Sequence, residues 1–359
     1  MSTRRTQTHY RGCLLGGAVG DALGAAPEFM SLARIRQSFG PAGVTDYVEA
    51  YGRQGAITDD TQLTLFTAEA LIRGHNRWLD RGLCSVIKVG HRAYVRWLHT
   101  QGGANVDKSY LTGWLVQQAG LHHRRAPGGT CLSALETGAP GTMARPINDS
   151  KGCGGVMRMA PVGLAKIDDC FTSGCELAAI SHGHPSGYLS AGLFAELIHQ
   201  LADGADLPAA LATSRERLRQ ETGHEETLTA VEAAIALART TDGTPEEVEQ
   251  LGGGWVGEEA LAIGVYCALK AQDFAHGVLM AVNHSGDSDS TGSIAGNILG
   301  LIHGEEGIPA RWLEHLELRD LIAEVATDLW LHFGEGEKPA GAVFESDRQS
   351  PDWDKYPGN

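Results

Sequence analysis

The sequence predicts an all-α protein with a single domain over residues 1–335, followed by an extended tail over residues 336–359. Apolar residues recur at helical spacing in most segments, and no segment shows the alternating pattern and hairpin turns of β-strands. Glycines at every fourth position of two segments also favour helices. No linker interrupts the predicted domain, whereas the tail is rich in proline, glycine and charged residues.

The first clear amphipathic segment covers residues 61–74. Leu63, Phe66 and Leu71 mark one face of a helix, and Gly74 is expected to cap its C-terminus. An acidic motif directly precedes this helix, so its N-terminus is of functional interest.

The second half of the chain predicts several further helices. Residues 207–239 are rich in Ala, Leu, Glu and Arg, which are strong helix formers. Thr244 is expected as the N-cap of the next helix, with Glu247 completing a capping box. Residues 258–270 predict another apolar helix, and residues 312–333 predict one or two more.

Two glycine stripes suggest a close contact between helices. The glycines that recur every four residues are Gly12, Gly16, Gly20 and Gly24, then Gly292, Gly296 and Gly300. Each glycine inside a helix costs about 0.5–1 kcal/mol relative to alanine, which is tolerable where two backbones approach closely. We therefore expect the two segments to be helices that pack together near a site; the alternative is that both are loops.

Composition restricts the class of protein and its partners. The 359 residues carry a formal net charge of −15, which argues against a broad nucleic-acid-binding surface. Seven scattered cysteines are no disulfide framework and indicate a reducing compartment. No segment approaches the roughly 18 uninterrupted apolar residues of a membrane helix. The expected location is cytoplasmic, without membrane attachment.

Two acidic motifs stand out, Thr-Asp-Asp-Thr at residues 58–61 and Asp-Ser-Asp-Ser-Thr at residues 287–291. Each precedes a predicted helix, so helix capping is one explanation. Capping needs only one such residue, however, and several carboxylates that converge without cations repel each other. Hard divalent cations with oxygen ligands resolve this repulsion, which favours a Mg²⁺ or Mn²⁺ site.

Two known patterns compete for the second motif. It matches the opening of an EF-hand loop, but the acid required at loop position 12 would fall at Ile298. It also fits the D-x-D-x-T motif of haloacid-dehalogenase-like phosphatases, with Asp287 as nucleophile. No alternating β/α pattern precedes it, so the phosphatase is kept as an alternative function only.

Four blocks in order resemble the ADP-ribosylglycohydrolase family. Residues 16–24 (GGAVGDALG), followed by Glu28, look like its opening helix, and residues 58–61 look like its first metal motif. Residues 150–161 resemble its Gly-rich block, and residues 284–292 resemble its closing signature. The resemblance covers roughly residues 10–305. Cys153 departs from the pattern, because many members carry asparagine there.

The resemblance implies an orthogonal helical bundle with a cleft that holds two Mg²⁺ or Mn²⁺ ions. The implied reaction is hydrolysis of the C1″ glycosidic bond between ADP-ribose and a protein acceptor, most often arginine. The implied partner is an ADP-ribosylated protein or a small molecule that contains ADP-ribose; a catalytically silent ADP-ribose-binding member is another alternative. The implied metal ligands are Thr58, Asp59, Asp60, Asp287, Asp289 and Ser290.

The remaining candidates have roles in catalysis or substrate binding. Asp289 or Asp59 is a candidate general base, and Glu28 a candidate for gating or contacting the metal cleft, unless it is a solvated loop acid. Backbone N–H groups of the glycine-rich block are candidates for binding the diphosphate, unless the block is an ordinary turn. The candidates for substrate binding are Gly152, Gly154, Gly155, His182, His284, Ser285 and Gly286.

Other patterns are weaker. A zinc site with Cys170 and Cys175 has a loose spacing and lacks a regular second pair, although His182 and His184 follow. Aromatic side chains such as Trp255 and Tyr266 are more typical of core packing than of stacking on adenine.

Overall fold

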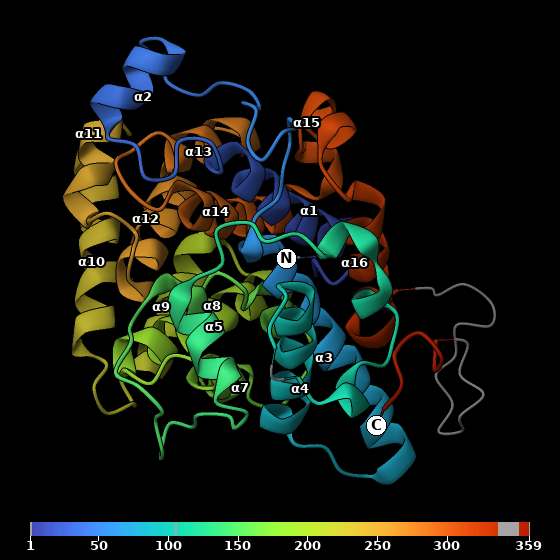
Figure 1. Cartoon of the computed structure of the whole chain (residues 1–359). Helices are drawn as coiled ribbons and strands as arrows, with labels where there is room; N and C mark the ends of the chain where they lie inside the picture. The colour runs from blue at the N-terminus through green and yellow to red at the C-terminus, as the bar shows by residue number, and fades with distance from the viewer. Residues whose placement is uncertain (1, 105, 337–351, 359) are drawn as a thin grey trace.

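The computed structural model describes residues 2–104, 106–336 and 352–358. Helices dominate these residues, and their few β-bridges are isolated rather than part of a strand, which confirms the all-α prediction (Figure 1). The α-helices are α1 (Gln7–Gly24), α2 (Leu32–Phe39), α3 (Asp59–Arg81), α4 (Val86–Thr100), α5 (Gly129–Glu136), α6 (Ala160–Leu164), α7 (Cys170–Ala179), α8 (Pro185–Ala202), α9 (Leu207–Leu218), α10 (Glu225–Thr240), α11 (Pro245–Val248), α12 (Gly257–Lys270), α13 (Phe274–Val282), α14 (Ser288–His303), α15 (Ala310–His315) and α16 (Arg319–Phe333). The 3-10 helices are η1 (Lys108–Tyr110), η2 (Leu115–Gln117), η3 (Ala119–Leu121), η4 (Cys153–Gly155), η5 (Glu249–Leu251) and η6 (Glu305–Gly307).

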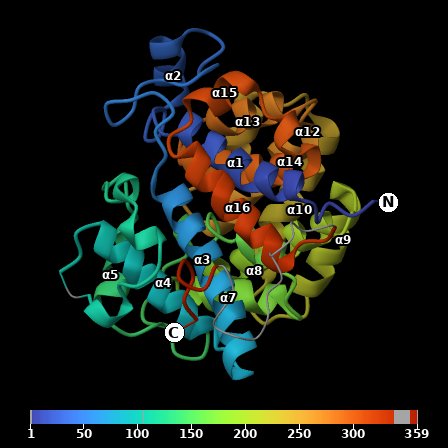
Figure 2. The same ribbon diagram turned by 90° about the vertical axis from the view of Figure 1, so that its right-hand side faces the viewer.

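Helices α1 and α14 pack side by side in the middle of the molecule (Figures 1 and 2). A Cβ atom at Gly20 would collide with the carbonyl group of Gly292, and one at Gly16 with the carbonyl of Gly296. The prediction that the two glycine stripes are helices in contact is therefore confirmed. The C-terminal end of α1 lies beside the first turn of α14, because a Cβ at Gly24 would collide with the backbone of Ser288. This contact brings the loop after α1 to the acidic motif that starts α14.

Helix α3 carries the first acidic motif at its N-terminus. Thr58 is its N-cap, with Oγ1 accepting a hydrogen bond from the backbone N–H of Asp60 at 3.3 Å. The predicted end at Gly74 is wrong, because the helix continues to Arg81 and Gly82 caps it in the left-handed region at φ 68°. Gly74 lies inside the helix, where α4 packs against α3.

The outer helices follow the predicted order. The helix-forming segment 207–239 contains two helices, α9 and α10, and the capping box between Thr244 and Glu247 is present at α11. Segment 312–333 likewise contains parts of two helices, α15 and α16, with Leu318 at φ 55° between them. In Figure 1, α2 and α10 lie at the edges, away from the α1–α14 pair.

The predicted extended tail falls mostly on residues 337–351, which lie outside the described residues. The described end of the chain, residues 352–358, packs against the body. Tyr356 is fully buried; its hydroxyl donates to Asp328 Oδ2 at 2.7 Å, and its carbonyl accepts from Asn76 Nδ2 at 2.9 Å.

Two further sequence expectations concern cysteines and membranes. All seven cysteines are free. Within the described ranges, no helix combines the length and the apolar character that crossing a membrane requires.

Candidate functional site

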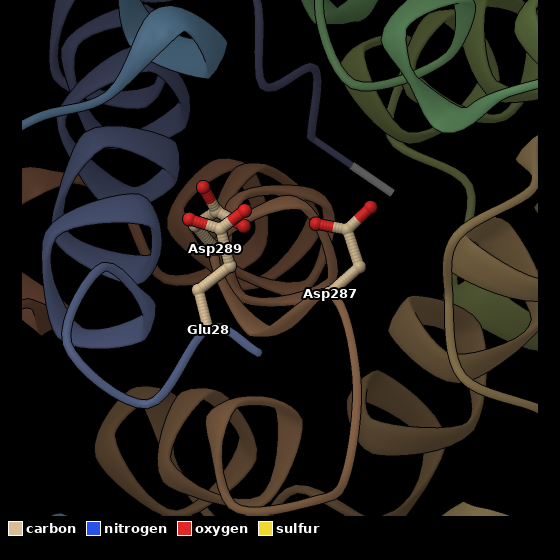
Figure 3. Close-up of side chains that lie close together, drawn as sticks. All are labelled: Glu28, Asp287 and Asp289. Carbon is tan, nitrogen blue, oxygen red and sulfur yellow. The ribbon is translucent and has the colours of Figure 1, made fainter. Parts of the chain in front are cut away.

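Carboxylates from two helix ends converge where α1 and α14 meet. Glu28 lies in the loop after α1, Asp287 is the N-cap residue of α14, and Asp289 lies in its first turn. Carboxylate oxygens of the three residues all lie within 4.8 Å of one another. Figure 3 shows the three side chains projecting toward the same space.

The three acids line a cleft of about 340 Å³ together with Asp59 and Asp60 from the start of α3. Ser290 also lines it, whereas Thr58 is fully buried behind it. No lysine or arginine occurs among the described residues of the lining. A larger hollow of about 670 Å³ next to the C-terminal half of α3 has a single carboxylate, that of Asp168, in its described lining.

Burial and mutual repulsion keep these acids from ionising easily. Burial, and then the charge of Asp289, raise the pKa of Asp60 well above its usual range. The same two causes, in the same order, raise the pKa of Asp287 and Asp59 and bring the pKa of Glu28 to about 10. Asp60 Oδ1 is buried without a hydrogen-bond partner. A divalent cation would relieve both the repulsion and the unpaired oxygen, so the donor set fits a hard metal ion.

Asp21 is a site residue that the sequence analysis missed. Its buried carboxylate accepts hydrogen bonds from the backbone N–H groups of Thr58, at 3.0 Å, and Thr61, at 3.1 Å, and from the Thr61 hydroxyl. Burial and the charge of Asp289 raise the pKa of Asp21 to about 7. Asp21 therefore attaches the start of α3 to α1. A signal was available, because Asp21 is the only acid within the small-residue block 16–24.

The glycine-rich block forms one wall of the cleft. Gly152 and Gly154 line it, and so does the buried ring of His182. Gly155 lies outside the lining, because it packs inside the protein, where a Cβ would be 2.9 Å from the carbonyl oxygen of Gly187. Cys153 lies between the glycines, and its thiol donates a hydrogen bond to Asp287 Oδ2 at 2.7 Å.

The structure places His284, Ser285 and Gly286 outside the acidic cleft. The buried His284 ring pairs through Nε2 with Thr291 Oγ1 at 2.9 Å, and so supports the first turn of α14. Ser285 Oγ accepts from the backbone N–H of Leu32 at 2.7 Å. Ser285 and Gly286 line a neighbouring hollow of about 260 Å³.

An aromatic pair lies at the boundary of the cleft and this neighbouring hollow. Phe29 and Trp255 line both, and their rings stack with centroids 5.1 Å apart. Both side chains are exposed, and Phe29 has a φ of 65°, which is uncommon for a residue with a side chain. The expectation of core packing is correct for Tyr266, which is buried, and wrong for Trp255, which is exposed. The residue type alone does not show whether an aromatic side chain is buried.

Two alternatives from the sequence find no support in the described part of the chain. Cys170 donates to Glu196 at 3.0 Å, and the carboxylate cluster described above is the one group there with metal-ligand spacing, so a zinc site with Cys175 is absent. No strand precedes Asp287 within those residues, so the phosphatase alternative is also wrong.

The buried His182 predicts acid sensitivity of the folded state. Burial, followed by the charge of Arg158, lowers the pKa of His182 to about 3. Between pH 7 and pH 5 the unfolded chain takes up a proton on this histidine and the folded chain does not, which should cost wild type about 2 kcal/mol of stability. We expect His182→Asn to remove this loss, as measured by denaturant unfolding at both pH values. His123→Asn, at an exposed histidine, is the control; equal pH dependence of all three proteins would contradict the prediction.

Comparisons with known proteins agree with the geometry. The sequence model of the ADP-ribosylglycohydrolase family matches residues 2–339. The ADP-ribosyl-[dinitrogen reductase] glycohydrolase of Rhodospirillum rubrum is 24% identical over 318 residues, 86% of this chain and 90% of its own. The ADP-ribosylarginine hydrolase Tri1 of Pseudomonas putida is 22% identical over 332 residues, 89% of this chain and 77% of its own. A solved structure titled ADP-ribosylglycohydrolase-related protein complex is 26% identical with a TM-score of 0.62, covering 92% of this chain and 99% of that one. The chain is a hydrolase of the ADP-ribosylglycohydrolase family.

Proposed function

We propose that this chain hydrolyses the C1″ bond between ADP-ribose and arginine on a protein, with two Mg²⁺ or Mn²⁺ ions held in the acidic cleft. The observation that carries the proposal is the convergence of five carboxylates in one cleft whose described lining holds no lysine or arginine. Without bound cations this arrangement has an unfavourable electrostatic energy, so it indicates a site made for cations.

The donor set suits hard divalent ions. The residues that would hold them are those implied by the sequence, Thr58, Asp59, Asp60, Asp287, Asp289 and Ser290, with Glu28 added by its position beside Asp287 and Asp289. Bound ions would fix the ribose hydroxyls and lower the pKa of a water molecule that attacks C1″.

The side chains and backbone of the cleft would orient the substrate and accept the proton. A carboxylate of Asp289 or Asp59 would accept the proton of the attacking water. The backbone N–H of Gly128 donates to Asp59 Oδ2 at 3.3 Å and restrains that carboxylate. The N–H groups of Gly152 and Cys153 already donate to Ser150 Oγ and to the carbonyl oxygen of Trp255. The backbone at Gly154, which lines the same cleft, would bind the diphosphate. The exposed ring of Trp255 offers a face on which adenine would stack.

Arginine is the acceptor that the observations favour. The similar protein of Pseudomonas putida is named an ADP-ribosylarginine hydrolase. The acidic cleft and the net charge of −15 favour the approach of a cationic guanidinium group.

Release of ADP-ribose from defined conjugates tests the proposal. The purified chain is incubated with ADP-ribosyl-arginine protein, ADP-ribosyl-serine peptide, an ADP-ribosylated nucleic acid and O-acetyl-ADP-ribose, each with Mg²⁺, Mn²⁺ or EDTA. We expect metal-dependent release that is fastest from the arginine conjugate. Faster release from another conjugate would overturn the acceptor, and release in EDTA would overturn the metal. Binding of ADP-ribose without any release would favour a silent member of the family.

Metal binding should also stabilise the folded protein. A ligand that binds only the folded state adds about 2.7 kcal/mol at a concentration one hundred times its Kd. We therefore expect Mn²⁺ or Mg²⁺ to raise the Tm of the EDTA-treated protein by several degrees, measured by differential scanning fluorimetry. Asp287→Asn should reduce this rise. Asp320→Asn is the control and should retain it, because the Asp320 side chain is 99% exposed, whereas the aspartates of the cleft are buried. Identical Tm values in EDTA and in saturating metal would contradict the prediction.

A further inference from the structure

The buried ring of His182 forms part of the cleft wall beside the glycine-rich block. The side chain is 1% exposed and contributes to the lining. A Cβ atom at Gly154 would lie 3.1 Å from Cε1 of this ring and 3.3 Å from Nε2, and one at Gly152 would lie 3.5 Å from Nε2. Nε2 therefore lies next to the two glycines that line the cleft, where a larger residue would crowd it. In the part of the chain that the structure describes, the hydrogen-bond partner of the ring lies at its other nitrogen, Nδ1.

Arg158 and Ser181 form a hydrogen-bonded chain that ends at this ring. Both residues are fully buried, and Arg158 Nη2 donates a hydrogen bond to Ser181 Oγ at 2.8 Å. Ser181 Oγ in turn lies 2.9 Å from His182 Nδ1. A guanidinium group can only donate, so the hydroxyl accepts from Arg158, and this bond strengthens the hydroxyl as a donor to Nδ1. An imidazole nitrogen that accepts a hydrogen bond carries no proton, so the proton of the neutral ring lies on Nε2.

Three further observations support this direction of the chain. The guanidinium group of Arg158 lies over the ring of Tyr94, 4.1 Å from its centroid, which restrains it. The sulfur of Cys131, another acceptor near Ser181, already accepts from Arg158 Nη1 at 3.6 Å and is a weak acceptor. Burial, followed by the charge of Arg158, lowers the pKa of His182 to about 3, so the ring is neutral at physiological pH.

A neutral N–H donor suits this cleft. Its described lining has five carboxylates and no lysine or arginine that could bind an anionic diphosphate. The backbone N–H groups of Gly152 and Cys153 are already used in internal hydrogen bonds. An N–H at His182 Nε2, beside Gly154, would add a donor at this wall without adding a charge.

We propose that Arg158 and Ser181 are positioning residues that hold His182 as the tautomer with its proton on Nε2, and that this N–H donates to an oxygen of the ADP-ribose diphosphate. The inference rests on the proposed function, because ADP-ribose has to occupy the cleft. His182 touches the substrate, whereas Arg158 and Ser181 act through His182. The same arrangement explains the glycine at position 154, since a side chain there would crowd the Nε2 edge of the ring.

Nuclear magnetic resonance of the full-length protein labelled with ¹⁵N-histidine tests the tautomer directly. Ring nitrogens with and without a proton have well-separated ¹⁵N signals, and the signals of His182 are those missing from His182→Asn. We expect a proton on Nε2 and an unprotonated, hydrogen-bonded Nδ1 in wild type at neutral pH. Addition of ADP-ribose with Mg²⁺ should shift the Nε2–H signal.

Ser181→Ala separates positioning from a structural role. Without the hydroxyl, the ¹⁵N signal of Nδ1 should move toward that of an acceptor without a hydrogen bond. The Kd of ADP-ribose, measured by calorimetry with Mg²⁺, should rise by about 3–10-fold, the effect of one hydrogen bond, because the ring is less restrained and its N–H less polarised. Ser214→Ala is the matched control. It removes an equally buried hydroxyl from α9, a helix absent from the described lining of the cleft, and should change neither the Nδ1 signal nor the Kd.

The outcomes separate this inference from the proposed function. A proton on Nδ1 of wild type would overturn the tautomer, and an unchanged Nδ1 signal and Kd in Ser181→Ala would overturn the positioning role. Circular dichroism checks that Ser181→Ala is folded, and Arg158→Lys, which keeps the charge but loses the fork of donors, is the second variant with the same expected shift of Nδ1. Binding of ADP-ribose that leaves the Nε2–H signal unmoved would overturn donation to the substrate while the proposed function stands. Failure of wild type to bind ADP-ribose would overturn both, although the tautomer would still be read from the free protein.

Discussion

Asp289→Asn is expected to lower the rate of ADP-ribose release by about 10²–10⁴-fold while the protein stays folded. Asp289 is 2% exposed, and its charge raises the pKa of each of the other cleft acids. Its carboxylate therefore acts electrostatically on every other acid of the cleft. Asparagine keeps the shape of the side chain but removes the charge, so both cation binding and proton acceptance should fail.

The stability of this variant should change in the opposite direction. Removing one of several repelling buried charges makes the metal-free folded state more favourable, so the Tm in EDTA should be equal to or higher than that of wild type. Steady-state release of ADP-ribose gives kcat/KM, and fluorimetry in EDTA gives the Tm. Asp320→Asn is the control for both. Activity of Asp289→Asn above a tenth of wild type would show that Asp289 is dispensable, and a large drop in Tm would show that it is structural.

Gly20→Ala is expected to destabilise the protein by about 1–3 kcal/mol or more, although alanine is the better helix former. The added Cβ would collide with the carbonyl group of Gly292, which is backbone of α14 and cannot rotate away. Helices α1 and α14 would have to separate, and with them Glu28 and Asp289. Activity should therefore fall together with stability.

Gly74→Ala is the matched control for this substitution. Gly74 lies in the interior of α3, where a Cβ would meet the Cys84 sulfur at 3.4 Å, an ordinary contact. We expect Gly74→Ala to be neutral or to stabilise by up to about 1 kcal/mol. Denaturant unfolding of both variants measures the difference. A Gly20→Ala protein as stable as Gly74→Ala would contradict the close approach of α1 and α14.

Local patterns in the sequence were sufficient for the helices and for the acidic motifs. Helical periodicity depends on neighbours three and four residues apart, so the all-α class and the capping box at Thr244 could be predicted. The two glycine stripes predicted the α1–α14 contact, because only a backbone contact compensates for so many glycines in a helix. The predicted helix end at Gly74 was wrong, because glycine occurs both at the end of a helix and inside one, and the local sequence does not distinguish the two cases; α3 continues to Arg81.

The assembly of the site was decided by tertiary structure. Glu28 lies more than 250 residues before Asp287, and only the α1–α14 contact brings their oxygens within 4.8 Å. Asp21 caps α3 from a different helix, and Trp255 lies at the rim with Phe29 rather than in the core. The sequence by itself determined which residues carry the chemistry, because charge and hydrogen-bonding capacity belong to each side chain. Which of them face one cleft depends on long-range packing between helices, and that packing is visible only in the folded chain.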